Sequence, residues 1–412
     1  MRILMLTSEF APVRGGIGTY AREIAAAASD LGANVTVAAP DYGKDNADED
    51  RLLPFEVLRF AGGLHSMRDL PAKIRLARRL IGSSRHDVVH AADWPFFIPL
   101  ALSRRLTTAR TLMSVHGTEI NETQTALKRL AIRCTGVFGP RSEVAANSHY
   151  TADLFRERFA VEGERIHAIP LGVSDFWFGE CRDRAATRAA HTIAPDRFVI
   201  VTVARITRRK GHPAVLAALS MLPEALLERV TWLVIGPDGE ADYVDELKQR
   251  AASSGCDVRF LGQMADEAIR DIYGAADLFC LAGVHDPSGR VEGFGLVYLE
   301  AGATGLPSVA TAIGGVPDAV IHGSSGLLVP PEVADIARAI AALAERAELR
   351  STLAAGAIAH ARALSWRRCA AETYGLPQPA PSAATNMPDH FAAAMARHED
   401  VAVFRLQRAS PP

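Results

Sequence analysis

Cysteine is scarce in this sequence, and its few cysteines are scattered. The chain of 412 residues has five, at positions 134, 181, 256, 280 and 369, and no two form a Cys-x-x-Cys pair. Structural zinc sites are built from such pairs, and disulfide frameworks need many cysteines in a short chain. The scarcity argues against both and favours a reducing compartment.

Long apolar runs and an excess of one charge are also missing. No run approaches the roughly 20 apolar residues that a membrane-spanning helix needs, and the first nine residues turn polar too soon for a signal peptide. The 45 basic and 47 acidic residues leave a formal charge of −2, so nothing global indicates nucleic acid as a partner. We therefore expect a cytoplasmic protein.

What the sequence does contain is a regular alternation of apolar strands and helical stretches, in two similar halves. Such alternation predicts parallel sheets covered on both faces, and the length suffices for two domains. The expected fold is α/β, with two doubly wound, Rossmann-like domains that face each other across a cleft. The strands are predicted at 2–7, 35–39, 56–60, 87–91, 110–115, 144–147 and 166–169, and then at 198–204, 231–235, 258–261, 278–281 and 308–310.

Lapses in this alternation mark the predicted domain boundaries. Residues 172–195 are polar and irregular, which predicts a linker between an N-terminal domain, 1–172, and a C-terminal domain, 195–364. The second sheet is complete before residue 365, so we expect the helix at about 365–376 to pack back on the first domain. The Pro- and Ala-rich residues 377–412 are expected to be a low-complexity tail.

The stretch Asp286–Pro307 carries the strongest functional signal. A predicted buried strand is followed by Glu292, a Gly-Phe-Gly turn and a predicted helix, Leu296–Thr304, that carries Glu300. This order puts both carboxylates at the carboxyl edge of a parallel sheet, where ligands bind in open α/β folds. The glycines allow a ligand close to the backbone, and the N–H groups of the first helical turn favour an anion. With Glu300 placed to accept hydrogen bonds from hydroxyls, the pattern predicts a sugar-nucleotide site.

A basic turn follows the first strand of the second half. Arg205 and Lys210 are a candidate diphosphate clamp, because a guanidinium can fork two phosphate oxygens and an ammonium adds a compact charge. Both should face the same sheet edge as Glu292. Arg208 and Arg209, which lie between them, are interpreted as solvated neighbours.

A glycine loop precedes the first helix of the chain. Gly16, Gly18 and Ala21, with Asp41 about 20 residues on, match a dinucleotide fingerprint. However, seven residues separate the first strand from Gly15, whereas the dinucleotide turn starts directly at the strand end. We favour a longer glycine loop that closes over a donor phosphate, with Gly15 and Gly16 near it, or that admits an acceptor.

Three further side chains follow strands of the first half. His116 comes after a buried strand and before a glycine, which makes it a candidate for a hydrogen bond to a sugar hydroxyl, although a lone histidine is more often structural. His90 and Asp93 occupy the equivalent edge of the preceding strand and are weaker acceptor-side candidates. The one Asp-x-Asp, at 48–50, lies in a predicted charged loop, 41–51, where it should be solvated, so no metal site and no cofactor are predicted.

With these pieces together, the chain resembles the family 4 retaining glycosyltransferases of the GT-B fold over roughly residues 1–375. Each motif is weak alone, but the ordered set is highly specific. The set comprises Gly15–Gly18, His116-Gly117, Ala146–Ser148, Pro170–Val173, Arg205 with Lys210-Gly211, Val234–Gly236, Phe260–Gly262, the two glutamates eight apart with Gly293, Phe294, Gly295 and Leu296 between them, Gly314–Pro317 and Gly326–Pro330.

The resemblance implies a role for each matched residue. Arg205 and Lys210 would hold the donor diphosphate, Glu300 the nucleotide ribose, and Glu292 the transferred sugar together with the amides of Gly293 to Leu296. Gly262 and Met264 would flank the base, and Gly16 would approach the phosphates. The implied reaction moves a sugar from a nucleoside-diphosphate sugar to a hydroxyl of a glycan, glycolipid or small glycoside, with retention and without a metal.

Alternatives and one partner remain open on the sequence. A GT-B-fold sugar-nucleotide epimerase or phosphorylase, or a non-catalytic sugar-nucleotide binder, would need a similar site. In the segment Ala126–Cys134, basic residues alternate with apolar ones, so it either packs as a helix on the first domain or touches an anionic membrane from the cytoplasmic side.

Overall fold

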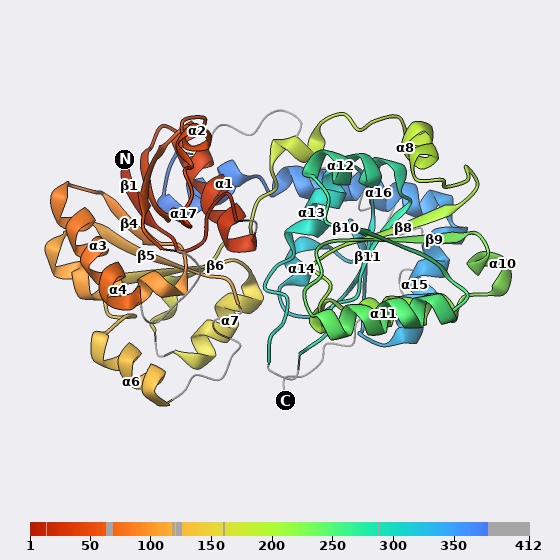
Figure 1. The fold of residues 1–412 in the computed structure, drawn as a ribbon. Helices are drawn as coiled ribbons and strands as arrows, with labels where there is room; N and C mark the ends of the chain where they lie inside the picture. The colour runs from red at the N-terminus through yellow and green to blue at the C-terminus, as the bar shows by residue number, and fades with distance from the viewer. Residues whose placement is uncertain are drawn as a thin grey trace. The chain divides into compact units, whose positions relative to one another are not determined.

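The chain folds into two compact domains (Figure 1). The first consists of residues 1–172 together with the segment that begins at Ser365, and the second consists of Val173–Leu364. Of the predicted tail, 377–412, only residue 377 belongs to the described part of the chain. The computed structural model describes residues 1–13, 15–62, 69–117, 120, 126–159, 161–286 and 289–377.

A parallel sheet forms the centre of the first domain. Its strands are β1 (Arg2–Leu6), β2 (Asn34–Pro40), β3 (Glu56–Phe60), β4 (Val88–Ala91), β5 (Arg110–Val115), β6 (Ser142–Ala146) and β7 (Ile166–Ala168). Among the described residues their order is β3-β2-β1-β4-β5-β6-β7, and all neighbours are parallel. The helices of this domain are α1 (Gly16–Asp30), α2 (Ala47–Asp50), α3 (Leu70–Ser83), α4 (Phe97–Ser103), α6 (Ala126–Thr135), α7 (His149–Arg158) and α17 (Trp366–Tyr374), with 3₁₀ turns η2 (Trp94–Phe96), η3 (Arg104–Leu106) and η4 (Gly163–Arg165).

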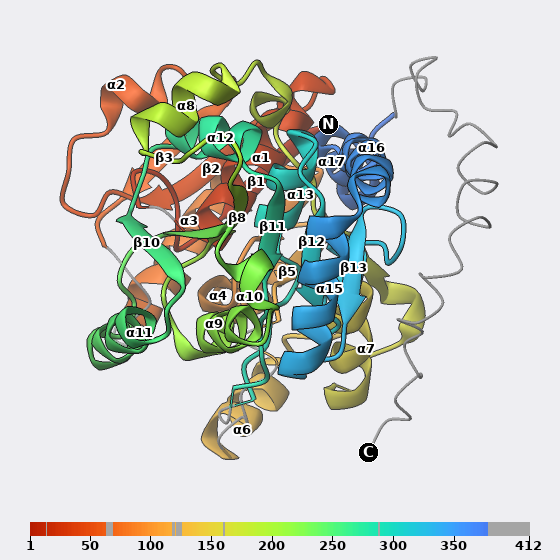
Figure 2. The same ribbon diagram turned by 90° about the vertical axis from the view of Figure 1, so that its right-hand side faces the viewer.

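The second domain repeats the design. Its strands are β8 (Phe198–Val203), β9 (Val230–Ile235), β10 (Asp257–Gly262), β11 (Leu278–Leu281), β12 (Ser308–Thr311) and β13 (Gly326–Val329). They are parallel in the order β10-β9-β8-β11-β12-β13, part of which can be followed in Figure 2. Its helices are α8 (Arg184–Ala190), α9 (His212–Ser220), α10 (Glu224–Leu227), α11 (Ala241–Ser253), α12 (Asp266–Ala275), α13 (Leu296–Ala303), α14 (Val316–Ala319), α15 (Val333–Glu345) and α16 (Ala347–Ala363), with 3₁₀ turns η5 (Asp175–Phe178) and η6 (Arg208–Lys210).

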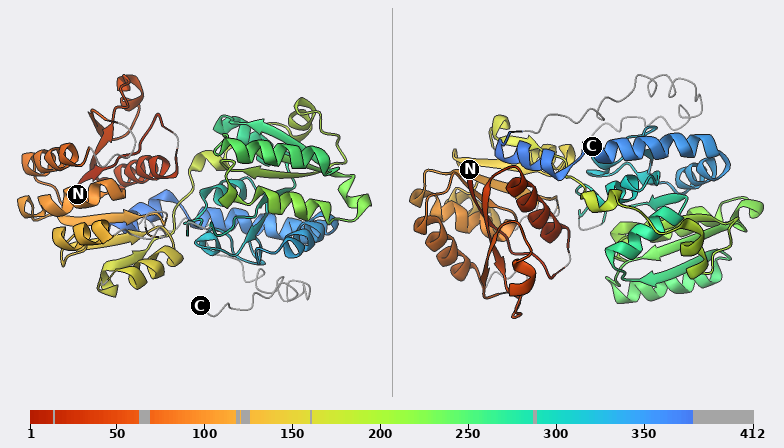
Figure 3. Two further views of the ribbon diagram at one scale, coloured as in Figure 1. Left: turned by 60° about the horizontal axis from the view of Figure 1, so that its bottom comes forward. Right: turned by 90° about the horizontal axis from the view of Figure 1, so that it is seen from above.

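Both sheets reverse their strand order at one place, which locates the ligand-binding edge. In each domain the first strand lies beside both the second and the fourth, as in the doubly wound Rossmann arrangement. Helices cover both faces of each sheet (Figure 3), so the central strands are apolar throughout, and all six residues of β8 are buried. The predicted α/β fold is confirmed. The reversal falls between β1 and β4 and between β8 and β11.

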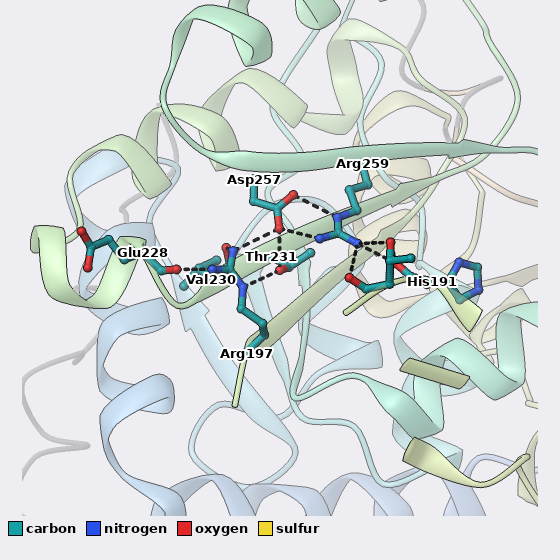
Figure 4. A network of polar contacts seen from close by, with 8 residues as sticks. His191, Arg197, Glu228, Val230, Thr231, Asp257 and Arg259 are labelled. Carbon is teal, nitrogen blue, oxygen red and sulfur yellow. Dashed lines mark hydrogen bonds and ion pairs between the residues drawn. The ribbon is translucent and has the colours of Figure 1, made fainter. Parts of the chain in front are cut away.

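A polar network joins the starts of β8, β9 and β10 in the second domain (Figure 4). It lies at the amino edge of the sheet, opposite the carboxyl edge where ligands bind in such folds. Arg197, just before β8, donates to Thr231 of β9 at 2.9 Å and to Asp257 of β10 at 3.0 Å. Arg259 donates to both oxygens of the same carboxylate, each at 2.9 Å. Burial raises the pKa of Asp257, but these hydrogen bonds and charges outweigh burial, and the pKa lies below its usual value. The network fixes the sheet whose other edge carries the candidate site.

Two segments that the sequence predicts to be irregular contain helices. The linker at 172–195 includes η5 and α8, and the predicted loop at 41–51 includes α2. Asp50 at the end of α2 pairs with Arg59 at 2.6 Å, and both side chains are only 15% exposed. The prediction that this acidic stretch is solvated is therefore wrong for Asp50. Short helices without an apolar stripe leave no periodic signal in the sequence.

Candidate active site

The site in the second domain is built where β8 and β11 end, at the reversal of strand order. The loop after β8 passes through η6 to Gly211, whose φ of 70° is left-handed, and then into α9. A Cβ at Gly211 would lie 1.6 Å from the carbonyl oxygen of Ala282, just after β11. The Val284 N–H also donates to the Arg209 carbonyl at 2.9 Å. Backbone contact thus holds the two loops together, and only glycine fits the crossing.

Three charged side chains meet between these loops. The Lys210 ammonium donates to Oε2 of Glu292, and the Arg209 guanidinium reaches the same oxygen at 3.4 Å. The side chains are 13%, 18% and 30% exposed for Lys210, Glu292 and Arg209 respectively. The structure therefore brings together Lys210 and Glu292, as the sequence predicts. The interpretation of Arg209 as a solvated neighbour is wrong, whereas Arg208 does point away.

The charges around Glu292 keep it ionised. Burial alone would raise the pKa of Glu292. The positive charges of Lys210 and Arg209, and the hydrogen bonds that they donate, outweigh burial, so the pKa lies below its usual value. Tyr298 of α13 is buried on the other side, and burial followed by the negative charge of Glu292 raises its pKa well above normal. The Tyr298 hydroxyl donates to the Leu281 carbonyl at 2.9 Å. A neutral phenol and an ionised carboxylate therefore stand side by side.

The start of α13 presents backbone N–H groups next to this cluster. Gly295 is the N-cap, with a left-handed φ of 99°, and a Cβ there would lie 2.6 Å from the Tyr298 ring. Phe294 is buried, which anchors the turn between Gly293 and Gly295, and Leu296 opens the helix. The capping residue has no side chain to accept from the first amides. This leaves them available for an anion.

Glu300 lies in the middle of α13 and is partly buried. Its negative charge contributes, after burial, to raising the pKa of Tyr273 well above normal. Tyr273 on α12 packs against Phe279 of β11, with ring centroids 5.9 Å apart. Glu300 therefore lies within electrostatic reach of Tyr273, which packs against the sheet. The partners of Glu292, Arg209 and Lys210, come instead from η6.

The remaining predicted residues of this domain lie at the ends of β8 and β10. Arg205 is exposed and makes no ion pair within the described part of the chain, and its stem lies against Gly239. Gly262 ends β10 with a left-handed φ of 68°, and its carbonyl accepts from the Gly236 N–H at 2.8 Å. Met264 follows and is partly buried. All three follow parallel strands, so they share the carboxyl edge with Lys210.

In the first domain, the glycine loop is arranged around a carboxylate that the sequence does not point to. Gly15 is the N-cap of α1, and Gly16 is its first residue. A Cβ at Gly15 would lie 1.8 Å from Oε1 of Glu9, and the same oxygen accepts from the Gly18 N–H at 3.3 Å. Glu9 therefore supplies the helix with the acceptor that its glycine N-cap lacks. The anion-binding end of α1 is occupied by the chain itself.

His116 follows β5, as predicted, and its ring is fixed on two sides. Its Nε2 lies 2.9 Å from the Ala92 carbonyl, and because a carbonyl only accepts, Nε2 carries the proton. The Tyr20 ring stands edge-on at a centroid distance of 4.7 Å. The His116 carbonyl accepts from the Asn147 side chain at 3.2 Å. The imidazole is thus held in one tautomer.

The two weaker candidates of this domain are buried rather than open to a ligand. His90 bonds Tyr374 of α17 through Nδ1 at 2.9 Å and Ser114 through Nε2 at 2.7 Å. Burial is the main reason that the pKa of His90 falls to about 3. Asp93 accepts at Oδ2 from the backbone N–H and from the hydroxyl of Ser8. The structure gives both residues positioning roles inside the domain, which the sequence prediction missed.

The fold and this edge define a class of protein. Among solved structures, HepE from Anabaena in complex with UDP has a TM-score of 0.72 at 23% identity, covering 90% of this chain and 98% of that one. Sucrose-phosphate synthase from Thermosynechococcus elongatus has a TM-score of 0.73 at 22% identity, covering 90% and 96%. At these identities the likeness shows the fold, which is the GT-B fold of two Rossmann-like domains.

The family follows from the sequence comparisons. The profile described as "Glycosyltransferase Family 4" matches residues 14–175, and "Glycosyl transferases group 1" matches residues 183–360. A D-inositol 3-phosphate glycosyltransferase from Actinosynnema mirum is 31% identical over 86% of this chain and 89% of its own length. A GDP-mannose-dependent phosphatidylinositol monomannoside mannosyltransferase from Mycolicibacterium smegmatis is 31% identical over 79% and 85%. The chain belongs to glycosyltransferase family 4 and is a glycosyltransferase.

The described residues also bear on possible partners. No helix there is long and apolar enough to cross a membrane. Within the same residues, no three His, Cys, Asp or Glu side chains are grouped so that they would hold a metal ion.

Proposed function

We propose that this glycosyltransferase moves a sugar from a nucleoside-diphosphate sugar to a hydroxyl of a glycan, glycolipid or small glycoside, with retention of the anomeric configuration. The observation that carries the proposal is the meeting of Lys210 and Arg209 with an ionised Glu292 beside the free amides of α13. A diphosphate needs an ammonium such as that of Lys210 and the amides, and a sugar needs the carboxylate. Relatives named for sugar transfer support the same reaction.

In the proposed reaction the second domain stabilises the leaving group. The bond between the anomeric carbon and the phosphate oxygen breaks, and negative charge develops on the diphosphate. In this proposal Lys210, Arg205 and the amides from Gly293 to Leu296 stabilise that charge. The acceptor oxygen forms the new bond on the same face, and its proton passes to the departing phosphate. Ionised Glu292 orients the sugar hydroxyls and Glu300 binds the ribose.

We further propose that the reaction needs no bound metal ion or other cofactor. The support is chemical: Arg205 and Lys210 both follow β8, and a guanidinium together with an ammonium can neutralise a diphosphate without a metal. The roles of His116 at a sugar hydroxyl, of Gly262 and Met264 at the base, and of Gly16 near the phosphates stay predictions.

A thermal-shift panel tests the donor site. UDP, GDP, ADP and TDP are added with and without magnesium, to the parental protein and to Arg205→Ala. We expect one diphosphate to raise the Tm without magnesium, because a ligand at about 100 times its Kd adds about 2.7 kcal/mol to stability. In Arg205→Ala, whose side chain makes no ion pair among the described residues, the rise should shrink while the Tm of the free protein stays.

The same donor then distinguishes transfer from its alternatives. With an acceptor, the product's anomeric signal in the NMR spectrum should have the donor's configuration. A product of inverted configuration contradicts retention. Free sugar or an isomer formed without acceptor would indicate an epimerase, release of a sugar phosphate with inorganic phosphate would indicate a phosphorylase, and binding without any turnover would indicate a sugar-nucleotide binder.

We also propose that the first domain contacts anionic membranes from the cytoplasmic side through a surface formed by α4, η3 and α6. Leu102, Leu106 and Leu130 are 43%, 46% and 56% exposed there, beside exposed Arg105 and Arg133. Hydrogen bonds from Arg104 to the carbonyls of residues 136 and 137 join η3 to the end of α6. Exposed apolar and arginine side chains on the same elements suit the boundary of an anionic bilayer.

Liposome flotation tests this surface. Serine at 102, 106 and 130 together should reduce recovery with anionic vesicles by about fivefold or more. The control is Met221→Ser, which removes an equally exposed apolar side chain, 57% exposed, from the second domain. Equal recovery of the triple variant and the parental protein would refute the contact, as would equal binding to neutral vesicles.

A further inference from the structure

Three consecutive basic residues form η6, and the first of them has other partners than the next two. Arg208 lies over the Tyr243 ring at 4.9 Å and pairs with Glu246 at 3.4 Å and Glu240 at 3.8 Å, on the α11 side of the turn. Arg209 and Lys210 both reach Oε2 of Glu292. A 3₁₀ turn advances about 120° per residue, which directs Arg208 to another side of the turn, while the long side chains of Arg209 and Lys210 converge on one carboxylate. Arg208 is therefore a surface charge, whereas Arg209 belongs to the site.

The two cations at Glu292 are not equivalent. Lys210 makes the closer contact and is 13% exposed, whereas Arg209 stands 3.4 Å away and is 30% exposed. Lys210 is also the group proposed to hold the donor diphosphate. When the donor diphosphate engages the Lys210 ammonium, Glu292 shares its principal counter-ion with a doubly charged anion. A carboxylate that is only 18% exposed is costly to leave without a cation.

We propose that Arg209 is a positioning residue that keeps Glu292 ionised and fixed in orientation while the donor diphosphate engages Lys210. This inference rests on the proposed function and adds a residue to it. The guanidinium suits the task because it stays charged at all working pH values and approaches from the same turn as Lys210. The backbone of Arg209 is itself fixed, since its carbonyl accepts from Val284.

The effect of losing Arg209 depends on which other groups face Glu292. Lys210 and Arg209 approach from η6, and Tyr298 approaches from α13. The loop after β12 contributes backbone only, with the Gly315 N–H donating to the Glu292 carbonyl at 2.9 Å. Both cations lower the pKa of Glu292. Without Arg209 the folded-state pKa rises, so the acidic limb of activity should move to higher pH.

The test compares Arg209→Gln with Arg208→Gln, which removes the same charge from the neighbouring position. For Arg209→Gln we expect the acidic limb of the pH profile to move up by about one pH unit, so that kcat falls by up to about tenfold at pH values on that limb, and the donor KM to change by less than about threefold. Arg209→Lys should restore the limb in part. Arg208→Gln should follow the parental profile.

Other outcomes would overturn the proposal. A donor KM raised about tenfold at unchanged kcat would make Arg209 a direct phosphate ligand, and a profile matching that of Arg208→Gln would make it a surface charge. A double-mutant cycle of Arg209→Gln with Glu292→Gln, followed by Tm without substrate, tests the pair independently of catalysis. If the Tm changes of the two single variants simply add, Arg209 and Glu292 do not interact and the proposal is refuted. If the changes are coupled but Glu292→Gln keeps full activity, only the function proposed for Glu292 is refuted.

Discussion

We expect Lys210→Ala to lower kcat for sugar transfer by about 10²–10³, the usual cost of removing one group that stabilises charge in the transition state. The ammonium is 13% exposed and stands between Glu292 and the proposed diphosphate position. Its removal leaves the leaving group with Arg205 and the α13 amides, and leaves Glu292 with Arg209 alone. Steady-state kinetics with the donor from the thermal-shift panel gives the measurement.

The matched control for this variant is Lys248→Ala. Lys248 is an exposed lysine of α11 in the same domain, over the Phe260 ring at 5.9 Å, so the net charge of the domain changes equally. Its kcat should stay within about twofold of the parental value. If Lys210→Ala transferred sugar at a comparable rate, the assignment of this edge as the active site would be wrong.

The largest effect on stability is expected for Arg188→Leu. Arg188 is 6% exposed and donates to three backbone carbonyls, those of Ala275, Pro195 and Arg197, each at 3.0 Å, and to Asp277 at 2.7 Å. Removing it leaves three carbonyl acceptors without this donor and takes from the largely buried Asp277 carboxylate the buried one of its two guanidinium partners. We expect the free energy of unfolding to fall by about 3–5 kcal/mol, measured by denaturant titration of the second domain's transition.

Arg184 offers the control because it pairs with the same carboxylate, at 2.6 Å, from a position that is 45% exposed. Water replaces most of what its guanidinium supplies, so Arg184→Ala should cost less than about 1 kcal/mol. Equal losses of unfolding free energy in Arg184→Ala and Arg188→Leu would contradict the view that burial of the guanidinium, rather than the ion pair itself, determines the size of the loss. Asp277 would remain bonded to the Val199 N–H in both variants.

Much of the fold could be predicted because buried parallel strands are continuous apolar runs. Every residue of β8 is buried, and its six apolar or β-branched residues leave no other interpretation. The pairing of Lys210 with Glu292 follows from the same logic, since loops after neighbouring strands meet at one edge. α2 and α8 were missed because they are too short and too polar to show a helical stripe.

The unpredicted parts of the site depend on turns rather than on elements. Whether Arg208 or Arg209 faces Glu292 is decided by where η6 begins, and a shift of one residue would exchange them. Glu9 reaches the start of α1 from the loop that follows β1, which has no periodic signal. His90 is buried because Tyr374, far away in sequence, covers it. Local patterns carry no information on such long-range contacts.

The return of α17 to the first domain has a consequence for the order of synthesis. The hydroxyl that bonds His90 belongs to Tyr374, whereas the rest of that domain ends at Gly172. A ribosome adding about 5–20 residues per second needs about 10–40 s for the intervening chain. Throughout that time the first domain exists without its last helix, and His90 lacks one of its two hydrogen-bond partners. The domain made first is therefore the domain finished last.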